Sequence, residues 1–253
     1  MIAYVRALSP HIARCELSFL QRDPIDPGLA QRQHQGYLAA LGELGCELKH
    51  LPPLPEHPDA VFVEDTAVIV PELTVITRPG VDSRRDEVDS VAATLAGDTR
   101  LARVREPGTL EGGDVLRIGH ALYAGLSARS NADGVAQLGS ALAPFGYSVQ
   151  GVTLGGCLHL KSAVTFIPPA TVLVNPDWID AGLFRACRVI SVDPQEPFGA
   201  NTLTVNGVTL VSSLYPRTRA RLESAGIATR ALEVGELHKA EAALTCMSLV
   251  FGD

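Results

Sequence analysis

Pairs of short apolar strands recur along the chain, and a two-residue turn separates the two strands of each pair. The strands are rich in valine, isoleucine, leucine and threonine, a composition that favours the β conformation. Asn206 and Gly207 form the clearest turn, because both residue types tolerate positive φ angles. We therefore predict four β-hairpins, at residues 67–77, 114–125, 163–174 and 202–212.

A helix is expected after each hairpin, where apolar residues recur with helical spacing. Two stretches each give one apolar stripe, formed by Val88, Val91, Ala92 and Leu95 in the first and by Val135, Leu138, Leu142 and Phe145 in the second. Gly97, Gly146 and Gly226 follow helical stretches and are expected to end them in a left-handed conformation. Asn175 and Pro176 predict the start of a further helix, as its N-cap and first residue.

The repeating unit is strand, strand, helix, strand, since a third strand follows most helices, as at residues 147–154 and 188–192. The N-terminal unit has a strand at 2–8, a helix near 29–44 and a strand at 46–51, so it lacks an opening strand. Residues 243–251, ALTCMSLVF, are predicted to form a buried strand that supplies it and closes the repeats into a ring. A β-propeller of four-stranded blades fits less well, because its repeats contain no helix.

The composition narrows the class of protein. The chain has 253 residues, of which 46% are hydrophobic, enough for one large core or two small ones. With a formal net charge of −7, the chain lacks the basic surface that duplex nucleic acid requires, although a local pocket could still bind a small cation. The chain has no membrane-spanning apolar run and no signal-peptide pattern. The five cysteines form no disulfide framework, so we expect a cytoplasmic protein. From the charge and the lack of a spanning run we expect neither nucleic-acid nor membrane partners.

A polar residue lies just before each expected first strand of a unit. These residues are Asp65, Glu111, His159, Asn201 and Cys246, at intervals of 42 to 48 residues. In isolation, Cys246 would be read as a small buried core residue. Five equivalent polar positions around a ring would instead point to one place, because a buried polar group without a partner costs about 1–3 kcal/mol.

This set of residues suits covalent chemistry on a cation. A thiol beside an imidazole is a nucleophile with its general acid and base. The carboxylates of Asp65 and Glu111 would repel a developing oxyanion, whereas they can bind a guanidinium in a bidentate manner. The pattern therefore predicts attack by Cys246 on a guanidinium carbon. The same residues could hold zinc, but no compact ligand spacing supports this, so we expect no metal.

Six short motifs, in this order and at this length, resemble the dimethylarginine dimethylaminohydrolase family. They are FVEDTAVI, TRPGVDSRRDE, EGGDVL, GLSARSN, LHLKS and LTCMSL, and the VRAL and QRQHQGY stretches also match. The resemblance implies the pentein fold, an α/β, five-bladed propeller of ββαβ repeats around a pseudo-fivefold axis, as a single catalytic domain over residues 1–253. It also implies hydrolysis of Nω-methylated L-arginine to L-citrulline and methylamine or dimethylamine, through a thiouronium on the cysteine and without a cofactor.

The resemblance also implies a role for each matching residue. Cys246 would be the nucleophile, His159 the general acid and base, and Glu111 and Asp65 the partners of the guanidinium. The remaining residues implied to bind the substrate are Glu64 and Asp59 lining the site, Arg84 and Arg129 at the α-carboxylate, Leu17 on a mobile lid at about residues 14–28, and the backbone from Ala240 at the α-amine. The chain departs from the family here, because it has alanines where glycines are usual before the cysteine.

Other functions remain open at this point. One is a deiminase or hydrolase of arginine or of another ω-substituted guanidine or ureido compound. A more distant one is a non-catalytic binding protein on the same fold, which would not need the complete set of cysteine, histidine and acids. The expected partner is a small guanidinium substrate, and the sequence leaves a homodimer open.

Overall fold

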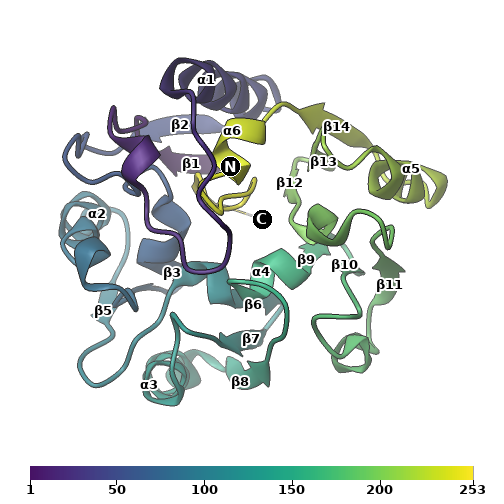
Figure 1. The fold of residues 1–253 in the computed structure, drawn as a ribbon. Coiled ribbons are helices and arrows are strands. Elements are labelled where there is room, and N and C mark those ends of the chain that lie inside the picture. Colours follow the sequence, from purple (N-terminus) through teal and green to yellow (C-terminus); the bar gives the residue numbers. More distant parts are fainter. Residues whose placement is uncertain (253) are drawn as a thin grey trace.

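Five three-stranded sheets surround one axis in the computed structural model, which describes residues 1–252 (Figure 1). The first sheet contains β15 (Leu249–Phe251), β1 (Ile2–Val5) and β2 (Glu47–His50), and the second β3 (Ala67–Val70), β4 (Leu73–Ile76) and β5 (Leu101–Arg103). The third contains β6 (Val115–Ile118), β7 (Ala121–Leu126) and β8 (Ser148–Thr153). The fourth contains β9 (Val164–Ile167), β10 (Thr171–Val174) and β11 (Arg188–Ser191), and the fifth β12 (Leu203–Val205), β13 (Val208–Ser212) and β14 (Thr229–Leu232).

Every sheet has the same topology, in which the middle strand is antiparallel to the first and parallel to the third. A tight turn can join only antiparallel strands, whereas a parallel pair needs a longer crossover. All four predicted hairpins are confirmed. The ring closes as predicted, because the C-terminal β15 pairs with the N-terminal β1, with Ala3 opposite Val250. This arrangement is the predicted five-bladed α/β propeller.

The crossovers carry most of the helices. These are α1 (Pro27–Glu43), α2 (Glu87–Leu95), α3 (Ala132–Leu142) and α5 (Pro216–Ser224), with the single-turn helices α4 (Leu160–Ala163) and α6 (Gly235–His238) elsewhere. All four residues of the first predicted stripe are buried on α2. The stripe on α3 is also buried, except that Phe145 lies beyond the helix and is partly exposed. Within residues 1–252, no helix has the length and hydropathy needed to cross a membrane.

Two of the three predicted helix-ending glycines are left-handed. Gly146 has φ of 80° and Gly226 has φ of 85°. The prediction for Gly97 is wrong, because its φ lies outside the left-handed region. There the chain turns with right-handed Ala96, and the amides of Asp98 and Thr99 donate to the carbonyl of Leu95.

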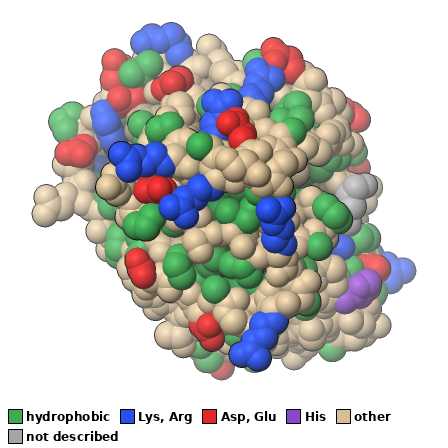
Figure 2. Space-filling view, turned by 90° about the vertical axis from the view of Figure 1, so that its right-hand side faces the viewer, with side chains coloured by type: hydrophobic (Ala, Val, Ile, Leu, Met, Phe, Trp, Pro, Cys, Tyr) green, Lys and Arg blue, Asp and Glu red, His purple; other side chains and the backbone are tan. Residues whose placement is uncertain are grey.

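The fourth blade differs from the others. The helix predicted at Asn175 and Pro176 does not form, and residues 175–187 contain only the 3-10 helix Ala181–Phe184, whose N-cap is Asp180. Asn175 instead accepts a hydrogen bond from the amide of Asp177 in a tight turn, a geometry that competes with helix formation. The space-filling view looks onto this side of the ring, where hydrophobic side chains lie exposed among lysines and arginines (Figure 2).

The predicted strand at residues 243–251 is also shorter than expected, since β15 begins at Leu249. Residues 244–247 form a turn instead, in which the amide of Cys246 donates to the carbonyl of Ala243. The carbonyl of Cys246 accepts from the amide of Glu64 in the neighbouring blade. The cysteine therefore lies in the segment that leads into the strand and not within the strand.

Candidate active site

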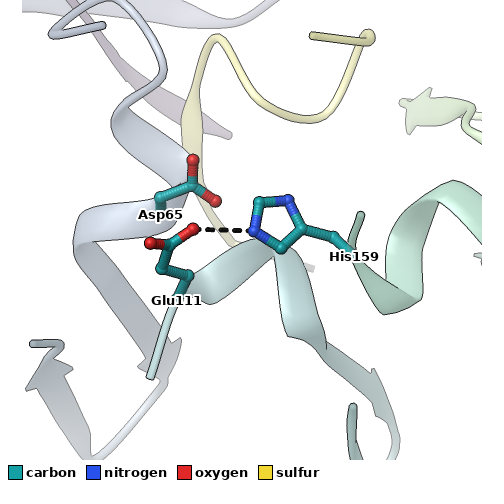
Figure 3. Close-up of side chains that lie close together, drawn as sticks. All are labelled: Asp65, Glu111 and His159. Atoms are coloured by element: carbon teal, nitrogen blue, oxygen red, sulfur yellow. Dashed lines mark hydrogen bonds and ion pairs between the residues drawn. The ribbon is translucent and has the colours of Figure 1, made fainter. Parts of the chain in front are cut away.

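Short turns at one end of the propeller axis bring the predicted residues together. Asp65 lies on the 3-10 helix Val63–Thr66, and Glu111 and His159 each directly precede a single helical turn. Figure 3 shows these three side chains pointing toward one another from three blades. One ligand atom from each lies within 4.8 Å of the other two. Cys246 lines the same cavity as Asp65 and His159.

Glu111 and His159 form a buried pair. Oε2 of Glu111 lies 2.7 Å from Nε2 of His159. The other carboxylate oxygen accepts hydrogen bonds from Arg129 Nη1 at 3.3 Å and from the amide of Gly80 at 3.1 Å. Burial favours a neutral Glu111, but the imidazole and the guanidinium groups of Arg84 and Arg129 outweigh it and lower the pKa of Glu111 to about 2.

The surroundings of His159 favour a protonated imidazole. Burial alone would lower the pKa of His159, but the carboxylates of Asp65, Asp114 and Glu111 raise it to about 9. The ring fits tightly, since a Cβ added to Gly113 would lie 2.9 Å from Nδ1 of His159. Near neutral pH this histidine is therefore ready to act as a proton donor.

The surroundings of Cys246 favour the neutral thiol. Burial raises the pKa of Cys246, and the carboxylates of Glu64 and Asp65 raise it further. Its sulfur also accepts a hydrogen bond from the amide of Ala243 at 3.4 Å. A bound cation would offset the two carboxylates and favour the thiolate.

The predicted substrate-binding residues surround the same cavity in part. Asp59, Arg84, Arg129 and Ala240 line it, together with the reactive residues. Arg84 is fully buried, and its Nη1 donates to Oδ2 of Asp65 at 2.6 Å. Asp59 accepts the amide of Glu16, and burial raises the pKa of Asp59 to about 6. In this state each arginine is paired with a carboxylate expected to bind the guanidinium.

Glu64, Leu17 and Glu111 are not among the described residues that line this cavity, and Glu111 reaches it only through His159. The amide of Glu64 donates to the carbonyl of Cys246, and its carboxylate accepts hydrogen bonds from Lys161 Nζ at 2.7 Å and from Thr245 Oγ1 at 2.5 Å. Leu17 packs against the core of the first blade.

Asn201 does not join the site, which corrects the expectation that all five equivalent positions meet. Its side chain accepts from the amide of Thr245 at 3.1 Å and donates to the carbonyl of Lys161 at 3.0 Å. Asn201 therefore supports the turn that carries Cys246.

The cavity is narrow, with a volume of about 20 Å³, which is room for about one water molecule. The segment between Cys15 and Asp26 crosses the centre of the ring in Figure 1, above the converging turns. The carboxylate of Glu241 holds it there by accepting hydrogen bonds from the amides of Ser18 at 3.0 Å and Phe19 at 2.6 Å, and from that of Leu20. Arg129 Nη2 also donates to Oγ of Ser18 at 2.7 Å.

Glu241 was not predicted to have a role, although its segment was identified as unusual. Glu241 has φ of 58° and is the one left-handed residue among 240–246. The alanines that follow it, where the family usually has glycine, are therefore not strained. The sequence signal was the departure from the family pattern before Cys246.

We predict that Glu241→Ala loosens this lid. Removal of a charged acceptor shared by three amides should make proteolysis within residues 15–26 about tenfold faster, since each tenfold corresponds to about 1.4 kcal/mol. Limited proteolysis followed by mass spectrometry measures this. Glu223→Ala, which removes an exposed carboxylate on α5, is the matched control and should be cleaved at the wild-type rate. Equal cleavage rates for all three proteins would show that Glu241 does not hold the lid.

The three converging side chains could also hold a metal ion by geometry alone. Glu111 and His159 already satisfy each other through their hydrogen bond, so a metal would have to break it. That no metal is required stays a prediction.

Comparisons with known proteins give one consistent result, although no protein-family model matches the chain. The chain is 39% identical over 250 residues to N(G),N(G)-dimethylarginine dimethylaminohydrolase from Streptomyces coelicolor, covering 98% of this chain and 95% of that protein. It is 32% identical over 228 residues to the protein of the same name from Pseudomonas aeruginosa, covering 89% and 90%.

A solved structure of the Pseudomonas aeruginosa enzyme, a cysteine-to-serine mutant complexed with citrulline, aligns with a TM-score of 0.94 at 30% identity. The alignment covers 98% of both chains. These findings confirm the resemblance inferred from the motifs: the chain belongs to the dimethylarginine dimethylaminohydrolase family.

Proposed function

We propose that this chain, as a single domain, hydrolyses Nω-methylated L-arginine to L-citrulline and methylamine or dimethylamine. The observation that supports this most directly is that the Cys246 thiol, the Asp65 carboxylate and His159 line one cavity, with Glu111 paired to His159 at 2.7 Å. A thiol and a protonated imidazole are what substitution at a guanidinium carbon needs, and the carboxylates suit the cation.

The bound guanidinium would favour the thiolate form of Cys246, which is the nucleophile. Its positive charge, placed beside Cys246, offsets the carboxylates of Glu64 and Asp65 that raise the pKa of the thiol. The thiol proton passes to solvent, the thiolate attacks the guanidinium carbon, and an S–C bond forms.

His159 would serve in both halves of the reaction. In the first, it donates its proton to the departing nitrogen, the C–N bond breaks, and a neutral amine leaves a thiouronium on Cys246. In the second, the neutral imidazole takes a proton from a water molecule that attacks the same carbon. As the S–C bond breaks, the proton of the added hydroxyl passes to the sulfur, which releases citrulline and the neutral thiol. Glu111 keeps the ring oriented and stabilises its protonated form.

Substrate binding would require the site to rearrange. The lid must open, and Arg84 and Arg129 must exchange their present carboxylate partners for the substrate α-carboxylate. Ala240, whose backbone lines the cavity, would bind the α-amine with Asp59, while Leu17 and Glu64 would complete the site. A cytoplasmic location and a homodimer also stay predictions, the former supported by five free thiols within residues 1–252.

An assay of four compounds tests the proposal. Dimethylarginine and monomethylarginine should both give citrulline with release of the methylated amine. Arginine should be at least about tenfold poorer in kcat/KM, the discrimination expected for small apolar groups. Methylguanidine should be very poor, because it has no carboxylate for Arg84 and Arg129. Arginine as the best substrate would indicate a deiminase, and no turnover with binding would indicate a non-catalytic protein.

A further inference from the structure

We propose that Asp114 is a positioning residue that holds the three active-site segments carrying Glu111, His159 and Arg129 in register. The kinetic part of this inference rests on the function proposed above. Asp114 ends the 3-10 helix Gly112–Asp114 and is completely buried. Asp114 is not among the described residues that line the cavity, so it acts on the site through its charge beside His159 and through the groups that it holds by hydrogen bonds.

The carboxylate of Asp114 accepts three hydrogen bonds, two from the turn that carries Arg129 and one from the residue after His159. Oδ2 accepts from the hydroxyls of Ser127 and Ser130, both at 2.6 Å. Oδ1 accepts from the amide of Leu160 at 3.0 Å. All three partners are donors, which is the arrangement that suits an ionised carboxylate.

Each donor connects Asp114 to one functional residue. Leu160 directly follows His159, so its amide fixes the backbone from which the imidazole extends. The hydroxyl of Ser130 accepts from the amide of Glu111 at 3.0 Å.

The third connection runs to the arginine. The hydroxyl of Ser127 accepts from the amide of Arg129 at 3.0 Å and also from that of Ser130 at 3.2 Å. One buried carboxylate therefore joins the turns of His159 and Arg129, which line the cavity, to the turn of Glu111, which contacts His159.

Tight packing keeps the carboxylate in this position. A Cβ added to Gly125 would lie 2.7 Å from Oδ1 of Asp114, so the neighbouring strand approaches as closely as a glycine allows. The carboxylate has no room to move, and removal of a partner leaves a buried polar group unsatisfied. A shift of about 1 Å in a catalytic group can lower the rate about 10²-fold.

Ser130→Ala tests the connection to Glu111 with the smallest change. We expect kcat for dimethylarginine to fall about tenfold with KM within about twofold of wild type, because the pair that performs the chemistry is displaced while the substrate-binding arginines remain. Ser140→Ala removes an exposed hydroxyl on α3 in the same blade and is the matched control, with unchanged kcat and KM.

Asp114→Asn tests the carboxylate, and we expect a fall in kcat of about 10²-fold. The double variant Asp114→Asn with Ser130→Ala should be no worse than Asp114→Asn alone, because both changes break the same network. Multiplying losses would overturn the proposal, as would a Ser130→Ala variant with wild-type kcat. If Asp114→Asn does not fold, the kinetics of Ser130→Ala and its titration, described below, still test the positioning role.

A readout without substrate separates this inference from the proposed function. The imidazole of His159 faces the carboxylates of Asp65, Glu111 and Asp114, and it shares the cavity with Cys246, Arg84 and Arg129. Its pKa, measured by NMR titration, should fall in Asp114→Asn and in Ser130→Ala but not in Ser140→Ala. Because Asp114→Asn also removes a charge that itself raises this pKa, the variant that keeps the charge decides: an unchanged titration in Ser130→Ala would refute the positioning role. If the wild type does not hydrolyse methylated arginines but the pKa of His159 shifts as expected, only the proposed function is refuted.

Discussion

Cys246→Ser is expected to leave the fold intact and to remove nearly all turnover of methylated arginines. Serine is close to cysteine in size, so the turn that precedes β15 should be kept. A hydroxyl is far harder to deprotonate than a thiol, and this site already disfavours the anion, because burial and the carboxylates of Glu64 and Asp65 raise the pKa of the thiol. The hydroxyl would therefore stay protonated even with the substrate cation bound. We expect kcat to fall by at least about 10⁴-fold, which a citrulline assay would measure.

Two further measurements make this test specific. Cys187→Ser, at a partly exposed cysteine between the fourth-blade strands β10 and β11, should keep wild-type kcat. Mass spectrometry of the wild type quenched during turnover should detect a covalent adduct on the peptide that contains Cys246. Retention of more than about a tenth of wild-type kcat by Cys246→Ser would rule out covalent catalysis through this residue.

Glu111→Gln should give the next largest effect, a fall in kcat of about 10²-fold or more, with a much smaller change in KM. The amide keeps the shape of the side chain but removes the charge that Nε2 of His159 faces at 2.7 Å. The pKa of His159, raised to about 9 with this carboxylate present, should fall in the variant. Since the imidazole must be protonated to release the amine, the alkaline limb of the kcat profile should move to lower pH.

The control for this variant is Glu72→Gln, which changes a glutamate in the β3–β4 turn that accepts a hydrogen bond from Tyr147. It should leave both kcat and its pH profile as in the wild type. If Glu111→Gln raises KM and leaves kcat and the alkaline limb unchanged, Glu111 binds the substrate and does not assist His159 in proton transfer.

Local patterns in the sequence determined most of the architecture. Paired β-rich runs around two-residue turns predicted all four hairpins, and the apolar stripe from Val88 to Leu95 predicted α2. The missing first strand of the N-terminal unit predicted that the chain closes on its own C-terminus. These predictions succeed because strand pairing and helix amphipathicity are short-range properties that recur with the period of each element.

The repeat also predicted which polar residues would approach one another. Asp65, Glu111 and His159 meet at the axis because each precedes the inner strand of its blade. Pseudo-symmetry in the sequence is enough to place their backbones at equivalent positions, and Cys246 reaches the same cavity from a turn rather than from the strand that was predicted.

Only the tertiary structure decided where each side chain points and what it contacts. Asn201 occupies an equivalent position, yet its side chain turns to Thr245, and Arg84 pairs with Asp65. The lid contact of Glu241 and the central position of Asp114 join residues that are up to 223 positions apart in sequence. No local pattern encodes such contacts, because they depend on how buried polar groups from different blades satisfy one another once the ring has closed.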